Sequence, residues 1–154
     1  MDVSSKYISI VVPAKNEAGN IEFLVDEIIT HLGSLYQFEI IYIDDGSSDS
    51  TAEKVLGLMR RYPDQVRLIQ HDSSVGQSTA IYTGVKQACG ELIVTIDADG
   101  QNNPADIINL IKTAETFPKG SDFCVAGYRK QRKDTAWKRF QSRIANNVRA
   151  KLLG

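Results

Sequence analysis

The stretch that organises this chain is Val94-Thr95-Ile96-Asp97-Ala98-Asp99-Gly100-Gln101-Asn102-Asn103-Pro104. An apolar, β-branched run over residues 92–96 stops at two carboxylates, Asp97 and Asp99, one residue apart. Glycine before this run, with glycine and proline after it, predicts a buried strand that ends at the carboxylates. Ligands of open α/β sheets bind just outside the carboxyl ends of the strands. Carboxylate oxygens there suit Mg²⁺ or Mn²⁺ held together with a substrate's phosphates. The alternative is an ordinary polar turn, since Asp, Gly and Asn are common turn residues.

The same pattern of an apolar strand followed by a polar loop occurs twice earlier in the chain. Residues 8–12 are predicted as a strand that Pro13 ends, with a polar loop over residues 13–20. Residues 38–43 are predicted as a strand that ends in Asp44-Asp45-Gly46-Ser47-Ser48-Asp49-Ser50-Thr51. Further strands are expected at residues 66–69 and 123–126. Helices are expected between them, from about Asn20, from Ser50 or Asp49, over 77–88 and from Pro104.

Strand and helix therefore alternate along the chain with short connections. This order predicts an α/β fold with a mostly parallel twisted sheet and helices on both faces. The helix at 77–88 has a small residue every four positions, at Ala80, Gly84 and Ala88, which predicts close packing on the sheet. The glycine fingerprints of dinucleotide-binding and P-loop proteins are both missing from the sequence, so those two classes lose their main support.

Composition limits the class further. A chain of 154 residues with 42% hydrophobic and 24% charged residues predicts one soluble globular domain. The sequence contains neither a signal peptide nor an apolar run long enough to span a membrane. Cys89 and Cys124 lie in apolar surroundings without neighbours at metal-binding spacing, so both are predicted to be buried reduced thiols in a cytosolic protein.

The charge is distributed unevenly. Residues 1–127 hold nine basic and eighteen acidic residues, whereas residues 128–154 hold nine basic residues and one acidic residue. Residues 135–153 are predicted to form an amphipathic helix with Trp137, Phe140, Ile144, Val148 and Leu152 on one face. Such a basic helix can lie on an anionic membrane surface. The alternative is an edge helix that packs on the sheet with a solvated basic face.

The three polar loops at residues 13–17, 44–49 and 97–101 should fall on one edge, because carboxyl ends of parallel strands point the same way. Acidic groups repel bare phosphate, so a divalent cation should bridge at Asp99. The other carboxylates suit hydroxyl and ring N–H groups, such as those of a ribose or a nucleobase. The pattern thus predicts a site for a nucleotide diphosphate compound with a metal.

Four ordered stretches carry a resemblance to a known family: residues 11–17 (VVPAKNE), 43–51 (IDDGSSDST), 76–90 and 97–104 (DADGQNNP). The chain resembles the family-2 glycosyltransferases of GT-A fold. It is most similar to the branch that contains dolichol-phosphate mannose synthases and undecaprenyl-phosphate sugar transferases. Downstream, residues 127–134 and Ser142-Arg143 resemble the acceptor-side segment of that branch.

The resemblance implies a role for each matching residue. The donor-binding residues would be Pro13, Ala14, Lys15, Glu17, Asp44, Asp45, Asp97 and Ala98. Asp99 would ligate Mg²⁺ or Mn²⁺, with Gln101 as a second ligand, and the catalytic set would be Asp97, Asp99 and Arg129. The acceptor phosphate would be met by Arg129, Arg132, Ser142 and Arg143.

The activity that follows is an inverting, metal-dependent transfer of a sugar from a UDP- or GDP-linked donor to a polyprenyl phosphate, at the cytoplasmic face of the membrane. A lipid phosphate needs no general base, because its second pKa of about 6 leaves it largely dianionic at pH 7. Residues 1–128 would be the nucleotide-sugar-binding core. Residues 129–154 would be a basic, membrane-facing acceptor segment that is incomplete at its C-terminal end.

Two alternatives to this activity remain at this point. One is a truncated, inactive nucleotide-sugar-binding fragment. The other is a metal-dependent nucleotidyltransferase, which the missing glycine-rich phosphate loop after the first strand disfavours. A nucleic-acid partner is not expected, since the basic segment has no recognisable reader motif, and a homo-oligomer is left open.

Overall fold

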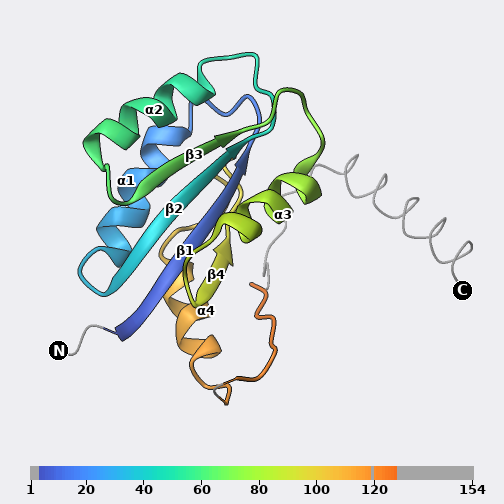
Figure 1. Ribbon diagram of the computed structural model, residues 1–154. Coiled ribbons are helices and arrows are strands. Elements are labelled where there is room, and N and C mark those ends of the chain that lie inside the picture. Colours follow the sequence, from blue (N-terminus) through green and yellow to red (C-terminus); the bar gives the residue numbers. More distant parts are fainter. Residues whose placement is uncertain (1–3, 119, 128–154) are drawn as a thin grey trace, which may run out of the picture.

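The computed structural model describes residues 4–118 and 120–127, in which four strands alternate with four helices (Figure 1). All pairings are parallel and the strand order is β3-β2-β1-β4. The predicted parallel α/β fold is therefore confirmed. The elements in chain order are β1 (Ser4–Ala14), α1 (Ile21–Leu32), β2 (Tyr36–Asp44), α2 (Thr51–Arg61), β3 (Val66–Gln70), α3 (Gln77–Gln87), β4 (Leu92–Thr95) and α4 (Asp106–Ala114).

Helices cover both faces of the sheet, as predicted. Successive residues of a strand point to opposite faces, so Ile8, Ile10 and Val12 of β1 enter one core and Val11 enters another. The larger core also holds the buried faces of α1, α2 and α4. The smaller core holds Ala80 of α3, and Figure 1 shows α3 on the opposite side of the sheet from α1 and α2.

Helix α3 packs closely on the sheet because its contacting residues are small. Ala80 is fully buried against the smaller core. A Cβ added to Gly84 would overlap Val11 and lie 2.6 Å from Cδ1 of Ile43. The predicted close packing of this helix is thus confirmed.

The first strand is longer than predicted, because Pro13 does not end it. Pro13 pairs with Ile43 in the parallel register of β1 and β2. The carbonyl oxygen of Val11 in β1 accepts a hydrogen bond from the backbone of Ile96. Every second residue of a strand directs its backbone groups to the same side, so the backbone of Pro13 also faces the side of β4. Strand β4 has already ended at Thr95. The missing N–H of proline therefore removes no bond from the ladder.

The region around β4 differs most from the prediction. β4 is an outer strand of the described sheet, and Ile93 is 40% exposed, so the strand is buried on one face only. Residues 121–127 contain no strand where one was predicted at 123–126. The ring of Phe123 instead stacks on Phe117, with 4.8 Å between the ring centroids.

Both cysteines are exposed, so their predicted burial is wrong. Cys89 lies in the loop that joins α3 to β4, and Cys124 lies in the irregular segment 121–127. The predicted helix over 135–153 and the whole segment 129–154 lie outside the described residues. Within the described residues, no helix has the length and apolar character needed to cross a membrane.

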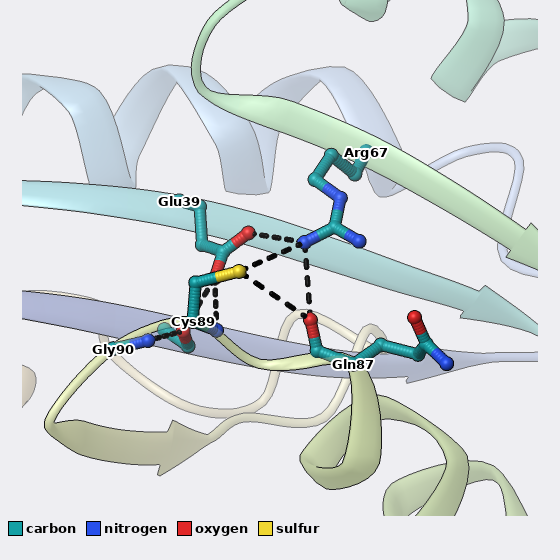
Figure 2. A network of polar contacts seen from close by, with 6 residues as sticks. Glu39, Arg67, Gln87, Cys89 and Gly90 are labelled. Atoms are coloured by element: carbon teal, nitrogen blue, oxygen red, sulfur yellow. Dashed lines mark hydrogen bonds and ion pairs between the residues drawn. The ribbon is translucent and has the colours of Figure 1, made fainter.

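A polar network secures the connection from α3 to β4 at the amino-terminal edge of the sheet (Figure 2). Glu39 of β2 is only 3% exposed, and its carboxylate accepts hydrogen bonds from Ser9 (2.6 Å), Arg67 (2.6 Å) and the backbone of Cys89 (2.8 Å). The backbone of Gly90 donates to Ser9 Oγ at 2.8 Å. Burial raises the pKa of Glu39, but these hydrogen bonds bring it below its usual value. The network holds the end of α3 and the start of β4 in place.

The packing of α3 can be tested by substituting a glycine in each of two helices. We expect Gly84→Ala to lower the free energy of unfolding by about 1–3 kcal/mol, because the added methyl group overpacks the contact with Val11 and Ile43. Gly57→Ala in α2 is the matched control, since a Cβ at Gly57 meets nothing within 4 Å. That control should raise the free energy of unfolding by about 0.5–1 kcal/mol. Urea unfolding measures both, and equal effects would contradict the close packing.

Candidate functional site

The three polar loops that were predicted to share one edge do so. Pairing of β1 with both β2 and β4 brings the carboxyl ends of these strands together, and the loops enclose a pocket of about 360 Å³. The start of α3 closes one side of it. The pocket is lined by Pro13, Ala14, Lys15, Glu17, Asp45, Ser74, Gly76, Gln77, Ala80, Asp97, Ala98 and Asp99.

The loop after β1 is fastened onto the loop after β2. Asn16 adopts a left-handed backbone conformation (φ 55°), and its side-chain oxygen accepts a hydrogen bond from the backbone of Ser48 at 2.8 Å. The backbone of Asn16 in turn donates to Ser47 Oγ at 2.9 Å. Farther along, Glu17 donates through its backbone to Thr51 Oγ1 at 2.9 Å. The serine- and threonine-rich stretch after β2 thus positions the pocket residues that follow β1.

Asp45 organises the loop that leads into α3. Its carboxylate is 4% exposed and accepts four hydrogen bonds, from His71 Nδ1 (2.8 Å), Ser74 Oγ (2.7 Å), and the backbones of Val75 (2.9 Å) and Gly76 (3.0 Å). Burial raises the pKa of Asp45, but these bonds together hold it well below its usual range. Asp45 is therefore a structural anion that borders the pocket.

Two further features fit this loop tightly against the end of β2. Gly46 has φ +67°, and a Cβ there would lie 2.7 Å from the backbone nitrogen of Ser74. Asp44 is also buried, and its carboxylate accepts bonds from the backbone of Ser47 (3.0 Å) and from Gln70 (3.3 Å). Asp44 does not line the pocket. Its carboxylate is engaged within the protein, on the β3 side of the site.

The two carboxylates after β4 are held in different ways. Asp97 is half-buried, and its Oδ1 accepts a hydrogen bond from the side chain of Gln77 at 2.7 Å. Asp99 is exposed, and its Oδ1 accepts a bond from the backbone of Gln101 at 3.0 Å, within its own turn. Gln101 lines a second pocket, of about 420 Å³, which Asp97 also borders.

The pocket is strongly acidic. In the part of the chain that the structure describes, its lining includes the side chains of Glu17, Asp45, Asp97 and Asp99, against one basic residue, Lys15. No cluster of three or more metal-ligating side chains occurs among residues 4–118 and 120–127. An exposed carboxylate such as Asp99 fits a cation that takes its remaining ligands from substrate phosphates and water, as Mg²⁺ does at many phosphate sites.

Seven of the eight predicted donor-binding residues line the pocket, and Asp44 is the exception. Arg129, Arg132, Ser142 and Arg143 lie outside the described residues. Sequence reasoning missed Ser74 and Gln77 as lining residues, although Gln77 falls in the stretch 76–90 that carried the resemblance. The start of a helix at this edge was available as a signal, because helices in such folds begin at the carboxyl ends of strands.

The fold and this pocket define an α/β protein with a pocket at the carboxyl edge of a parallel sheet, which is where open α/β folds bind their ligands. A family model described as "Glycosyl transferase family 2" matches residues 9–153. The chain therefore belongs to glycosyl transferase family 2.

Individual relatives agree with this assignment. Undecaprenyl-phosphate 4-deoxy-4-formamido-L-arabinose transferase from Photorhabdus laumondii is 35% identical over 97% of this chain and 45% of its own length. The chain thus spans less than half the length of the curated relatives it matches. A Pyrobaculum calidifontis mannosyltransferase, solved with GDP-Man and Mn²⁺, has a TM-score of 0.62 and 28% identity over 70% of this chain and 32% of its own.

A second solved structure supports the fold alone. Glucosyl-3-phosphoglycerate synthase from Mycobacterium tuberculosis, in complex with UDP, has a TM-score of 0.60 and 24% identity. The match covers 74% of this chain and 42% of that chain. The predicted GT-A architecture is confirmed by these likenesses.

The anchoring role of Asp45 can be tested by Asp45→Asn. We expect this variant to lower the free energy of unfolding at pH 7 by about 2–4 kcal/mol, because hydrogen bonds to a buried charge are strong and the amide cannot accept all of them. Asp72→Asn, an exposed position in the same loop, is the matched control and should have little effect.

The pH dependence gives an independent check on Asp45. Because its pKa is lowered in the folded protein, its contribution is complete above the unfolded value of about 3.9 and declines as the pH falls below that. Thermal unfolding between pH 7 and pH 3 should therefore show a smaller loss of stability at acid pH for Asp45→Asn than for wild type. An equal loss of stability with falling pH in Asp45→Asn and wild type would contradict the anchoring role of Asp45.

Proposed function

We propose that this chain carries the nucleotide-sugar-binding part of an inverting glycosyltransferase, which transfers a sugar from a UDP- or GDP-linked donor to a polyprenyl phosphate. The observation that carries the proposal is a pocket to which all three strand-end loops contribute, with Asp97 and Asp99, one residue apart in the sequence, at its border. Family membership over residues 9–153 supports the same class of reaction.

Different parts of the pocket would bind different parts of the donor, according to their chemistry. The loop after β1, with Pro13, Ala14 and Glu17, would meet the nucleoside, because it combines apolar surface with a carboxylate that can accept ring N–H and hydroxyl groups. Asp45 would border that part of the ligand while keeping its loop in place. Asp97 would accept hydroxyl groups of the nucleotide sugar, since no described residue donates a hydrogen bond to its second oxygen.

The diphosphate would be met at Asp99. Mg²⁺ or Mn²⁺ bound there, with Gln101 as the proposed second ligand, would neutralise the charge that develops on the leaving diphosphate. Lys15 at the pocket and Arg129, farther along the sequence, would add positive charge for the same phosphates. The Mn²⁺ and GDP-Man in the similar mannosyltransferase support this arrangement.

The acceptor would be a polyprenyl phosphate at an anionic membrane surface on the cytoplasmic side. The names of the curated relatives support this class of acceptor. The basic segment at residues 129–143 suits it as well, because guanidinium groups bind phosphate oxygens in pairs. Inversion requires the acceptor to attack from the face of the anomeric carbon opposite to the leaving diphosphate. The dianionic phosphate would serve as the nucleophile without a general base.

The donor site is tested by calorimetric titration of UDP, GDP and CDP, each with and without Mn²⁺. We expect one nucleotide to bind in a Mn²⁺-dependent manner, and Asp99→Asn to weaken that binding about tenfold or more, because a charge-assisted contact is lost. Asp64→Asn, an exposed carboxylate in the turn between α2 and β3, is the control and should bind as wild type does. No binding by a folded wild-type sample would contradict the proposal.

The acceptor is tested separately by Arg129→Ala and Arg132→Ala. We expect each to reduce transfer to a short-chain polyprenyl phosphate about tenfold or more, because hydrogen bonds to an ionised phosphate are lost. Lys112→Ala, exposed on α4, is the control for loss of an unrelated positive charge. Unchanged transfer in both arginine variants would rule out the acceptor assignment and leave the donor site as proposed.

A further inference from the structure

Gln77 is the first residue of α3, and its side chain reaches across to the end of β4. Its Nε2 donates a hydrogen bond to Asp97 Oδ1 at 2.7 Å. The contact joins two elements that are 20 residues apart in sequence and that border the same pocket. Among the described residues, no other group donates to Asp97. Within the described part of the chain, Gln77 is therefore the side chain that holds this carboxylate by a hydrogen bond.

The backbone of Gln77 is fixed by two independent contacts. Immediately before it, the backbones of Val75 and Gly76 donate to the buried Asp45, which ties the start of α3 to the end of β2. Two turns later, Gly84 leaves no space for even a methyl group between α3 and the sheet. The glutamine side chain is exposed, but it starts from a rigid point. Its contact with Asp97 thus follows from the packing of the helix.

As a consequence, the two carboxylate oxygens of Asp97 differ in their hydrogen bonding. Oδ1 is engaged by the amide, whereas no described residue donates a hydrogen bond to Oδ2 beside the pocket. Asp99 is different, because its Oδ1 is held by the backbone of Gln101 in the same turn and its side chain is exposed. Different groups therefore donate hydrogen bonds to the two carboxylates. The donor to Asp97 belongs to another element, whereas the donor to Asp99 belongs to its own turn.

We propose that Gln77 is a positioning residue, which orients Asp97 so that one carboxylate oxygen is presented to the hydroxyl groups of the donor's sugar. The inference rests on the proposed nucleotide-sugar site and adds a residue to it. A carboxylate held by one amide keeps a full acceptor for a hydroxyl group, and it does not have to be ordered again when the ligand arrives. Gln77 thereby acts on the sugar part of the donor and leaves the nucleoside part unaffected.

The test compares nucleotide sugars with the corresponding nucleoside diphosphates. Binding of GDP-mannose, GDP, UDP-N-acetylglucosamine and UDP is measured by calorimetry in the presence of Mn²⁺, for wild type and for Gln77→Met, which keeps the length of the side chain but cannot donate. We expect Gln77→Met to weaken the better-binding nucleotide sugar about tenfold, because a charge-assisted hydrogen bond no longer fixes Asp97. The affinity for the matching nucleoside diphosphate should change less than about twofold.

Two further variants separate positioning from general damage. Gln77→Lys restores a donor at this position and should recover most of the lost affinity. Ser78→Ala changes the next, exposed residue of the same helix turn and should leave both affinities unchanged. Thermal unfolding checks that each variant is folded, which a side chain at the exposed start of a helix should allow.

The outcomes distinguish this inference from the function on which it rests. If wild type binds neither nucleotide sugar nor nucleoside diphosphate, both the function and the inference are wrong. If wild type binds and Asp97→Ala weakens the nucleotide sugar, while Gln77→Met binds as wild type does, the function stands and the inference is wrong. An equal loss for nucleotide sugar and nucleoside diphosphate in Gln77→Met would show a structural role for Gln77, which also overturns the inference.

Discussion

Two buried carboxylates hold helix α3, one at each end. One lies in β2 and the other on the residue directly after β2. The site depends on this arrangement. Asp45 accepts the backbone hydrogen bonds of Val75 and Gly76 at the start of the helix. Glu39 accepts the backbone hydrogen bond of Cys89 just beyond its end. Gly84 adds the close contact in between. Because the helix is fixed at three points along its length, the residues at its first turn occupy a defined place beside the pocket.

Each carboxylate is stable in its buried position because donors surround it. An ionised carboxylate removed from water is costly unless hydrogen bonds replace its hydration. Glu39 receives bonds from Ser9, Arg67 and the backbone of Cys89. Asp45 receives four bonds, two of them from backbone groups at the start of a helix, where unpaired N–H groups favour negative charge. Removing either carboxylate would leave several of these donors without an acceptor.

Short apolar runs that alternate with helical periodicity were enough to predict the parallel sheet, the helices on both faces and the edge at which the loops meet. These features follow from local periodicity and from the parallel direction of the strands. The predicted strand at 123–126 is wrong because an apolar run specifies a strand only when a neighbour pairs with it. Phe123 instead stacks on Phe117. The run at 92–96 was predicted to form a buried strand, but Ile93 is exposed, so among the described residues only one face of β4 is buried.

The roles of individual acidic residues were harder to predict, because two similar patterns have different surroundings. Asp44-Asp45 and Asp97-Ala98-Asp99 both follow an apolar strand at the same edge. The first pair is buried and engaged within the protein, whereas Asp99 is exposed. The difference comes from the loop before α3, whose Gly76 contacts Asp45 from 31 positions farther along the chain. Short motifs contain no information about a donor at that distance.

The acidic lining of the pocket also affects how fast a ligand can enter. Among the described lining residues, the carboxylates of Glu17, Asp45, Asp97 and Asp99 outnumber the single basic side chain, that of Lys15. A free nucleoside diphosphate is an anion, so it meets a repulsive field that extends over a Debye length of about 8 Å at physiological ionic strength. Added salt should therefore speed its encounter with the pocket, in contrast to the usual slowing of electrostatically steered association. A nucleotide that already carries a divalent cation has lost most of this negative charge. For the proposed nucleotide donor, the charges of the described pocket residues therefore favour arrival with the cation already bound.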